Sequence, residues 1–253
     1  MRAPRPTRFA SSRTSALAVL LLAFAAAAPA VAAPRVQVMV VGRSSLLLAP
    51  RTVDAHRVVV RASGKRCTAA AGTPLAALAG ARRAGGPGFR VRDYGGSCSR
   101  SARDGGQLFV TSVGGQRNRG RDGWVYKVGA RSGTAGAADP TGPFGGGRLR
   151  AGQRVTWFWC RMGRGGSCQR TLAVSGASRV ARGGRLRVVV RGYDDFGRAR
   201  RIRGARVSLG GRSVVSNRRG VAVVRAPAQA GRARLTATKR GLVRAFDRTV
   251  TVG

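Results

Sequence analysis

The chain has 253 residues, and 48 Lys or Arg against 8 acidic residues give it a formal net charge of +40 at pH 7. Forty-five of the cations are arginine, all eight acids are aspartate, and there is a single histidine. Without glutamate and with one histidine, few groups are available for acid–base catalysis, so the composition argues against an enzyme.

Residues 1–33 have the pattern of a signal peptide. Four arginines precede an apolar run at residues 16–24, and Ala-Val-Ala at residues 30–32 is a small-residue cleavage signature, so we expect cleavage after Ala32 or Ala33. The alternative is an uncleaved membrane anchor, for which the apolar run is short. Cleavage would remove four arginines, leave +36, and leave no later segment able to anchor the chain in a bilayer.

The next part, residues 34–165, combines short strands with one clear helix signal. Thr73 is a natural N-cap, Pro74 suits the first helical position, and Arg82 and Arg83 suit the C-terminal end. Gly-Gly-Pro-Gly at residues 85–88 ends the helix. The alternating or β-branched runs predict strands at residues 35–41, 45–49, 57–61, 89–91, 107–113, 123–128 and 154–160. One helix on several strands predicts an α+β domain.

Two of these strands contain all three tryptophans. Trp124 and Tyr126 share one face of their strand, and Trp157 and Trp159 share one face of theirs. Packing in the core or against the C-terminal domain is the first interpretation, because these are the largest apolar side chains of a small domain. The second is a ligand-binding face, for which stacking on Trp beside Arg would suit a planar, anionic or sugar-like molecule.

Three short segments carry a family resemblance: GTPLAAL at residues 72–78, DGWVYKV at 122–128 and AGQRVTW at 151–157. This pattern resembles a bacterial secreted family of unknown function that is similar to the C-terminal domain of transcobalamin. The resemblance implies a β-grasp-like fold, a helix cradled by a mixed sheet, and the ancestry of a binding module. That family usually has Asn-Gly after the Tyr strand, where this chain has Gly129-Ala130 and a long loop. No cobalamin-binding motif matches, so we expect no cofactor.

The last part, residues 171–253, has a different pattern. Short alternating runs recur at residues 171–174, 186–190, 205–209, 221–224, 234–238 and 249–252, separated by glycine turns. Such spacing without a helix signal predicts a small β-sandwich. The runs at residues 204–207, 217–222 and 231–237 are similar to bacterial immunoglobulin-like and carboxypeptidase-regulatory-like domains. Those domains usually act as spacers or adhesion modules.

The chain has four cysteines: Cys67, Cys98, Cys160 and Cys168. In an exported chain they predict two disulfides. Three pairings are possible, and Cys67–Cys98 with Cys160–Cys168 is the simplest because each bond then joins neighbouring elements. The first loop would contribute about 3–4 kcal/mol in the chain-entropy model. No Cys-x-x-Cys occurs, so we expect no metal site.

Catalytic groups are scarce. Asp194-Asp195 is the only adjacent carboxylate pair, and its glycine-flanked setting favours a turn over a calcium site. His56 is interpreted as a surface residue, and no serine lies in a nucleophile motif.

The arginines occur in every segment of the chain. This even distribution of arginines favours a solvated cationic surface. The near-exclusive use of arginine and aspartate as charged residues is typical of a G+C-rich coding sequence. Such a charge nevertheless attracts polyanions at low salt.

The sequence therefore predicts a secreted, non-enzymatic binding or adhesion protein of the bacterial envelope or exterior, whose partner is an unidentified small molecule or surface polymer. The alternative is a cationic envelope protein that holds acidic wall polymers or nucleic acid through charge alone.

Overall fold

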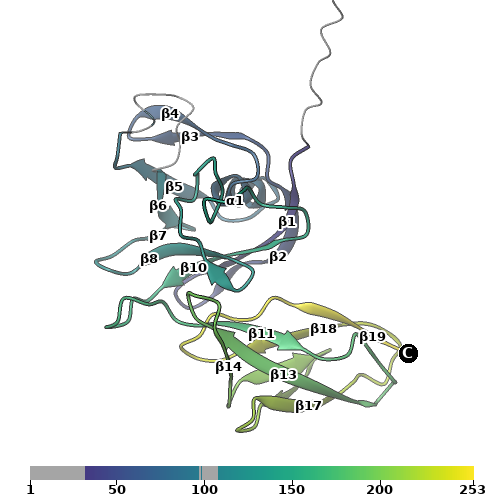
Figure 1. Cartoon of the computed structure of the whole chain (residues 1–253). Coiled ribbons are helices and arrows are strands. Elements are labelled where there is room, and N and C mark those ends of the chain that lie inside the picture. The colour runs from purple at the N-terminus through teal and green to yellow at the C-terminus, as the bar shows by residue number, and fades with distance from the viewer. Residues whose placement is uncertain (1–31, 97, 99–107) are drawn as a thin grey trace, which may run out of the picture. The chain divides into compact units, whose positions relative to one another are not determined.

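A computed structural model describes residues 32–96, 98 and 108–253. The predicted signal segment lies outside these residues except for its last two positions. Residues 33–253 form one compact unit, mostly of β-strands, with the helix α1 among the strands of its first half (Figure 1). The β-rich, α+β-like class expected from the sequence is thus confirmed at this level. Over the described residues, no helix has the length and apolar composition needed to cross a membrane.

The first sheet has the strand order β2-β1-β10-β8-β9. Its central pair, β1 and β10, is parallel, and the other pairs are antiparallel. β-Branched and aromatic residues fill these strands, as expected for half-buried pleated surfaces. The bounds are β1 Arg35–Val41, β2 Leu46–Asp54, β8 Gly123–Val128, β9 Arg131–Ser132 and β10 Arg154–Cys160.

The second sheet has the order β4-β3-β5-β6-β7. A two-residue turn at Ser63 and Gly64, both with positive φ (50° and 80°), joins β3 to β4, which is the geometry that favours glycine in a hairpin. Cys67 lies on β4, the strand that follows this turn. The bounds are β3 Val58–Ala62, β4 Lys65–Ala69, β5 Phe89–Asp93, β6 Leu108–Val113 and β7 Gln116–Arg117.

The helix α1, Pro74–Arg83, begins where the sequence predicts. The hydroxyl of Thr73 accepts a hydrogen bond from the Ala76 N–H at 3.2 Å and donates to the Ala70 carbonyl at 2.8 Å. Leu75 and Leu78 are fully buried, and one apolar core joins the helix to strands of both sheets.

Both predicted disulfides are present, with the simplest of the three pairings. Cys67 on β4 bonds to Cys98, with 5.5 Å between the Cα atoms, and Cys160 at the end of β10 bonds to Cys168, with 5.2 Å.

The second half contains two more sheets that enclose a core of their own. In one, β13 pairs with β11, β14 and β17; the other has the order β12-β19-β18-β15-β16. The bounds are β11 Thr171–Ser175, β12 Arg179–Val180, β13 Arg185–Tyr193, β14 Ala199–Arg201, β15 Arg206–Leu209, β16 Arg212–Val215, β17 Val221–Arg225, β18 Gly231–Thr238 and β19 Arg248–Val252.

The Thr73 cap gives a direct test of the helix start. We expect Thr73→Ala to lower the free energy of unfolding by about 1 kcal/mol, because the N–H of Ala76 loses its acceptor inside the protein. Thr73→Ser keeps the hydroxyl and should restore most of the loss. Urea unfolding of the three proteins measures this, and equal stability of the Ala and Ser variants would contradict the capping role.

Candidate functional site

Four aromatic residues were predicted to form either core or a ligand-binding surface. They lie in two opposite pairs on the neighbouring strands β8 and β10. Trp157 is paired with Tyr126, and Trp159 with Trp124. The ring centroids lie 5.4 and 5.9 Å apart, the second pair edge to face, a geometry that stabilises aromatic pairs. All four side chains belong to the core of the first half, and none exposes more than 7% of its surface.

Three of the four polar groups of this cluster, and a ring face of Trp159, have protein partners. The indole N–H of Trp124 donates to the Gln116 carbonyl at 2.6 Å, and that of Trp157 donates to the Pro74 carbonyl at 3.3 Å. The guanidinium of Arg43 lies 4.0 Å from the ring centroid of Trp159. In this arrangement the rings expose too little surface for a ligand to stack on them. Their role in ligand binding stays a prediction.

The hydroxyl of Tyr126 is buried with its ring. It donates a hydrogen bond to the Ala135 carbonyl at 2.6 Å. Desolvation, with a smaller contribution from the negative charge of Asp139, raises the pKa of Tyr126 well above its ordinary value of 10.0. The neutral phenol is therefore the form that the fold accommodates.

Lys127 occupies the opposite face of β8 and is the most deeply buried cation of the described chain. Its side chain has no exposed surface. The ammonium Nζ lies 2.9 Å from the Asp194 carbonyl, 3.1 Å from the Tyr193 carbonyl and 3.3 Å from Oδ1 of Asp195. Three oxygens thus face the three N–H donors of one ammonium group. Desolvation lowers the pKa of Lys127, and the Asp195 charge opposes that shift.

The Asp194-Asp195 segment is the predicted turn. Oδ1 of Asp194 accepts the backbone N–H groups of Phe196 and Arg198. Desolvation alone would raise the pKa of Asp194, but these N–H groups and the Arg170 guanidinium lower it below its ordinary value. Asp195 binds Lys127, the Ser132 hydroxyl and the Cys168 N–H. Within the described residues, no group of three His, Cys, Asp or Glu side chains could hold a metal ion.

A more accessible surface lies on the outer face of the β4-β3-β5-β6-β7 sheet. Inward residues such as Val60, Ala62, Val91 and Val110 are buried, so alternate positions point outward. The outward positions form a row that we call the arginine face: Val59, Arg61, Arg66, Arg90, Arg92, Tyr94 and Phe109.

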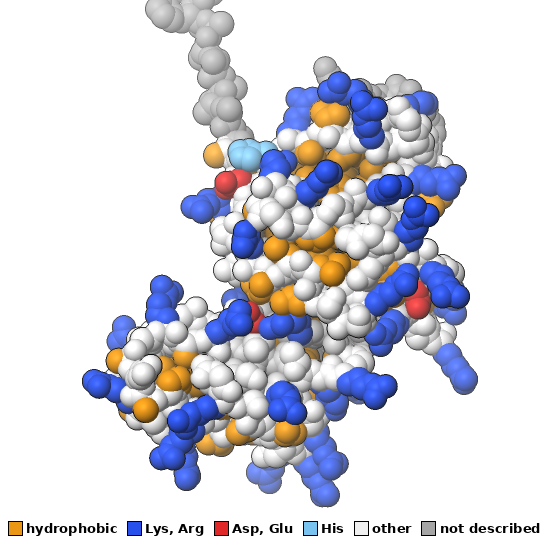
Figure 2. Space-filling view, turned by 180° about the vertical axis from the view of Figure 1, so that it is seen from behind, with side chains coloured by type: hydrophobic (Ala, Val, Ile, Leu, Met, Phe, Trp, Pro, Cys, Tyr) orange, Lys and Arg blue, Asp and Glu red, His pale blue; other side chains and the backbone are white. Residues whose placement is uncertain are grey.

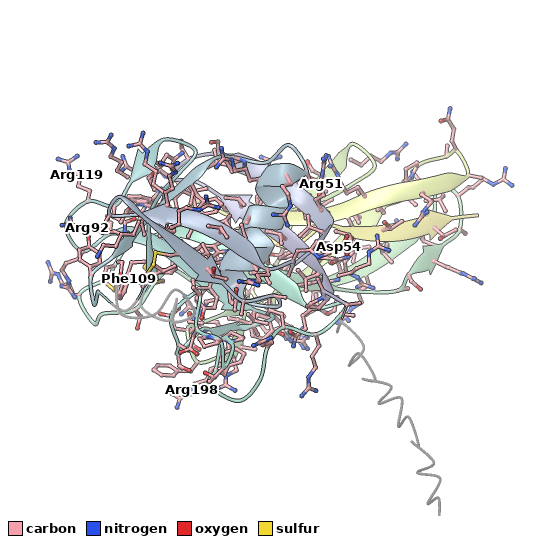
Figure 3. All side chains as sticks on the ribbon, turned by 90° about the horizontal axis from the view of Figure 1, so that it is seen from above. Arg51, Asp54, Arg92, Phe109, Arg119 and Arg198 are labelled. Atoms are coloured by element: carbon pink, nitrogen blue, oxygen red, sulfur yellow. A yellow bond between two sulfur atoms is a disulfide. The ribbon has the colours of Figure 1, made fainter. Side chains whose placement is uncertain are left out.

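The arginine face combines unpaired cations with exposed apolar groups. Val59, Phe109 and Tyr94 expose 48%, 53% and 63% of their surface. Arg92 and Phe109 are opposite each other on β5 and β6 and lie at one end of the molecule in Figure 3. In the part of the chain that the structure describes, the guanidinium groups of Arg61 and Arg90 have no hydrogen-bond or ion-pair partner in the protein.

A hollow of about 640 Å³ borders the arginine face between β3 and β5. Its apolar lining includes Val58, Val60 and Phe89 from the two strands and Ala79 from α1. Four arginines and no carboxylate complete the lining: Arg61, Arg82, Arg83 and Arg90. An apolar floor with a cationic rim suits a ligand that is both apolar and anionic.

A second cationic hollow, of about 510 Å³, is lined by the β1–β2 turn and the β18–β19 loop. Four of its five cations have acceptors in the protein: Arg43 donates to the Arg117 carbonyl, Arg161 to the Arg43 carbonyl, Lys239 to the Arg203 carbonyl and Arg244 to Asp247. Figure 2 shows Lys and Arg side chains spread over the whole visible surface. The arginine face differs from this hollow because three exposed apolar side chains, Val59, Tyr94 and Phe109, lie beside its free donors.

No motif in the sequence marks Arg61, Arg90, Tyr94 or Phe109 as site residues. The signal available was alternation: Val59 and Arg61 on one predicted strand, and Arg90 and Arg92 on another, are spaced by two.

Comparisons with protein-family models, curated proteins and solved structures give no match to this chain.

The Lys127 site predicts a specific loss of stability. Lys127→Met should lower the free energy of unfolding by about 3 kcal/mol, because it leaves Asp195 and two carbonyls without their cation. Lys65→Met, at an exposed position, is the matched control and should change stability by less than about 0.5 kcal/mol. Guanidinium unfolding provides the measurement.

A double-mutant cycle isolates the pair. If Lys127 and Asp195 stabilise each other, Lys127→Met with Asp195→Asn should cost clearly less than the sum of the two single variants. Additive costs would show that the two side chains act independently.

Tyr126 predicts an alkaline dependence of stability. Its pKa is raised by folding, so the neutral phenol contributes fully below the unfolded pKa of about 10 and is lost progressively as the pH rises above it. Tyr126→Phe should remove that part of the decline and, at pH 7, cost about 1 kcal/mol for the lost hydrogen bond. Tyr94→Phe is the control with an exposed ring. An unchanged alkaline slope in Tyr126→Phe would contradict the assignment.

Proposed function

We propose that the chain is an exported, non-enzymatic binding or adhesion protein of the bacterial envelope or exterior, and that it binds acidic ligands on the arginine face. The observation that carries the proposal is the set of unpaired guanidinium groups beside exposed apolar side chains. Arginine with free donors recognises carboxylates and phosphates in bidentate fashion. Exposed aromatic rings add apolar contact area that charge alone does not supply.

The arrangement of strands supports a β-grasp-like first module at residues 34–165, related to the transcobalamin C-terminal domain. The first sheet begins with a hairpin, β1 and β2, and its last strand, β10, lies parallel to β1 in the centre of the sheet. The helix α1 comes between them in sequence and shares their core.

The two sheets around a separate core support an immunoglobulin-like second module at residues 171–253. In this proposal the second module acts as a spacer or adhesion module. Two disulfides are compatible with a protein of an oxidising compartment, and the signal-peptide pattern supports export.

The positions of the polar groups support a role without catalysis. His56 is exposed, and Asp54 pairs with Arg35 at 3.5 Å at the start of β1. Asp194, Asp195 and Asp247 are engaged with cations of the protein itself. These carboxylates act as structural acceptors.

The alternative function is attraction of acidic wall polymers or nucleic acid by net charge alone. The scatter of cations in Figure 2 favours it. The two functions differ in whether the position of an arginine matters, because attraction by net charge depends on how many charges are removed and not on where they lie.

A matched pair of variants separates the two. We expect Arg61→Gln/Arg90→Gln to weaken binding of labelled polyglutamate or polyphosphate about tenfold and to reduce the salt slope by about two, one per lost contact. Arg218→Gln/Arg219→Gln removes the same charge from an exposed turn of the second half and should change affinity less than twofold. Fluorescence anisotropy over a salt series measures both. Equal losses for the two pairs would support charge alone.

A further inference from the structure

β3 and β5 are parallel neighbours that pair at one position only. Ala62 is opposite Val91, and the ladder between the two strands stops there. Before this pair the strands separate, and the hollow of about 640 Å³ lies between them, with Ala79 of α1 in its lining. The sheet is therefore open along part of its length.

The backbone groups that face this opening follow from the neighbouring ladders. The two-residue turn after β3 makes Ala62 and Lys65 a hydrogen-bonded pair, so Val59, opposite Thr68, falls at a non-hydrogen-bonded position. Val59 thus directs its N–H and C=O away from β4, toward β5. The turn after β6 similarly makes Ser112 and Arg90 a hydrogen-bonded pair, so Phe89 directs its N–H and C=O toward β3.

The opening is thus bordered by strand edges, an apolar floor and a cationic rim. Unpaired strand edges are templates for another strand. Val60 and Ala79 make the floor apolar, while Arg61 and Arg90 supply free positive charge on the arginine face. An acyl chain would satisfy the floor but not the edges, and a nucleic acid would satisfy the charge but offers no matching row of amide donors and acceptors.

We propose that this opening binds an extended acidic peptide segment of a partner protein, which adds as a strand between β3 and β5. The inference rests on the proposed function and names its partner class. Side chains of an added strand alternate between the two faces of the sheet. Every second side chain would then be apolar and face α1, and the intervening acidic side chains would face Arg61 and Arg90.

A six-residue probe tests this pattern: acetyl-Glu-Val-Glu-Val-Glu-Val-amide carrying a fluorophore. The control peptide has the same side chains with every second backbone nitrogen methylated, which keeps the charge and removes the donors needed for strand pairing. We expect the unmethylated probe to bind the full-length mature protein at least tenfold more tightly. We also expect the amides of Val59 and Phe89 to exchange rapidly in the free protein and to become protected when the probe binds.

A pair of valine substitutions provides a second test. Val59→Asp places a carboxylate beside the opening and should weaken probe binding at least tenfold by repulsion. Val223→Asp introduces the same charge at a similarly exposed valine of β17, 51% against 48% exposed, and should leave binding unchanged. Thermal unfolding of both variants checks that they are folded, and the exchange measurement on the unsubstituted protein does not depend on either.

The outcomes separate this inference from the proposed function. Equal affinity for the methylated and unmethylated probes, or binding without protection of Val59 and Phe89, would overturn strand addition and leave charge recognition on the arginine face. Failure to bind the probe together with position-dependent binding of polyphosphate would also overturn the inference alone. Failure of every acidic ligand to bind in a manner that depends on Arg61 and Arg90 would overturn both.

Discussion

The burial of Lys127 constrains more of this structure than any other single contact. Transfer of an ammonium group from water into a protein interior costs several kcal/mol unless its donors are satisfied. Here the Tyr193 and Asp194 carbonyls and the Asp195 carboxylate satisfy them. Because these oxygens belong to a turn 66 to 68 positions later in the chain, the ammonium group of a first-half strand is satisfied by the second half.

The same contact fixes the register of β8. Trp124, Tyr126 and Val128 point into the first core, and Lys127 points to the other face. If β8 shifted by one residue, its two faces would be exchanged. The Lys127 ammonium would then lie among aromatic rings, and Tyr126 would lie among the three oxygens of Tyr193, Asp194 and Asp195, which we call the oxygen cage. Asp195 also accepts the N–H of Cys168, so the cage adjoins the Cys160–Cys168 disulfide at the end of β10. Strand register, ion pair and disulfide therefore stabilise one arrangement.

Local features of the sequence were enough to predict much of the fold. Thr73 and Pro74 mark the start of α1, alternation marks the longer strands, and cysteine spacing favours the observed disulfides. The strands of two to four residues, such as β7, β12 and β14, carry too little periodicity to be recognised, because neighbouring strands hold them in place. The partnership of Lys127 with Asp195 depends on tertiary contact, and no local pattern encodes it.

The candidate site was harder to predict than the fold, for a reason rooted in composition. The chain has 45 arginines, so nothing in the sequence sets Arg61 and Arg90 apart from the other arginines. Tryptophan and tyrosine are scarce, so they draw attention, yet a small domain uses its largest apolar side chains in the core. Burial of Trp124 and Trp157 follows that rule, while the exposed rings of the arginine face, Tyr94 and Phe109, lie in sequence contexts with no distinctive motif.

The arginines become distinguishable once their donors are considered. Many serve the fold: Arg51 donates to the Ala84 carbonyl at the end of α1, Arg225 to the Gly183 carbonyl in a turn, and Arg43 stacks on Trp159. A planar guanidinium can donate hydrogen bonds to carbonyls and also stack on an aromatic ring, whereas a lysine ammonium is a more strongly hydrated point charge. Arginines without such a role keep their donors for other molecules. Arg61 and Arg90 belong to this second group, and they border the one place where β3 and β5 separate. In a chain this uniformly cationic, specificity can arise from which guanidinium groups the fold leaves unused, and from the strand edges exposed beside them.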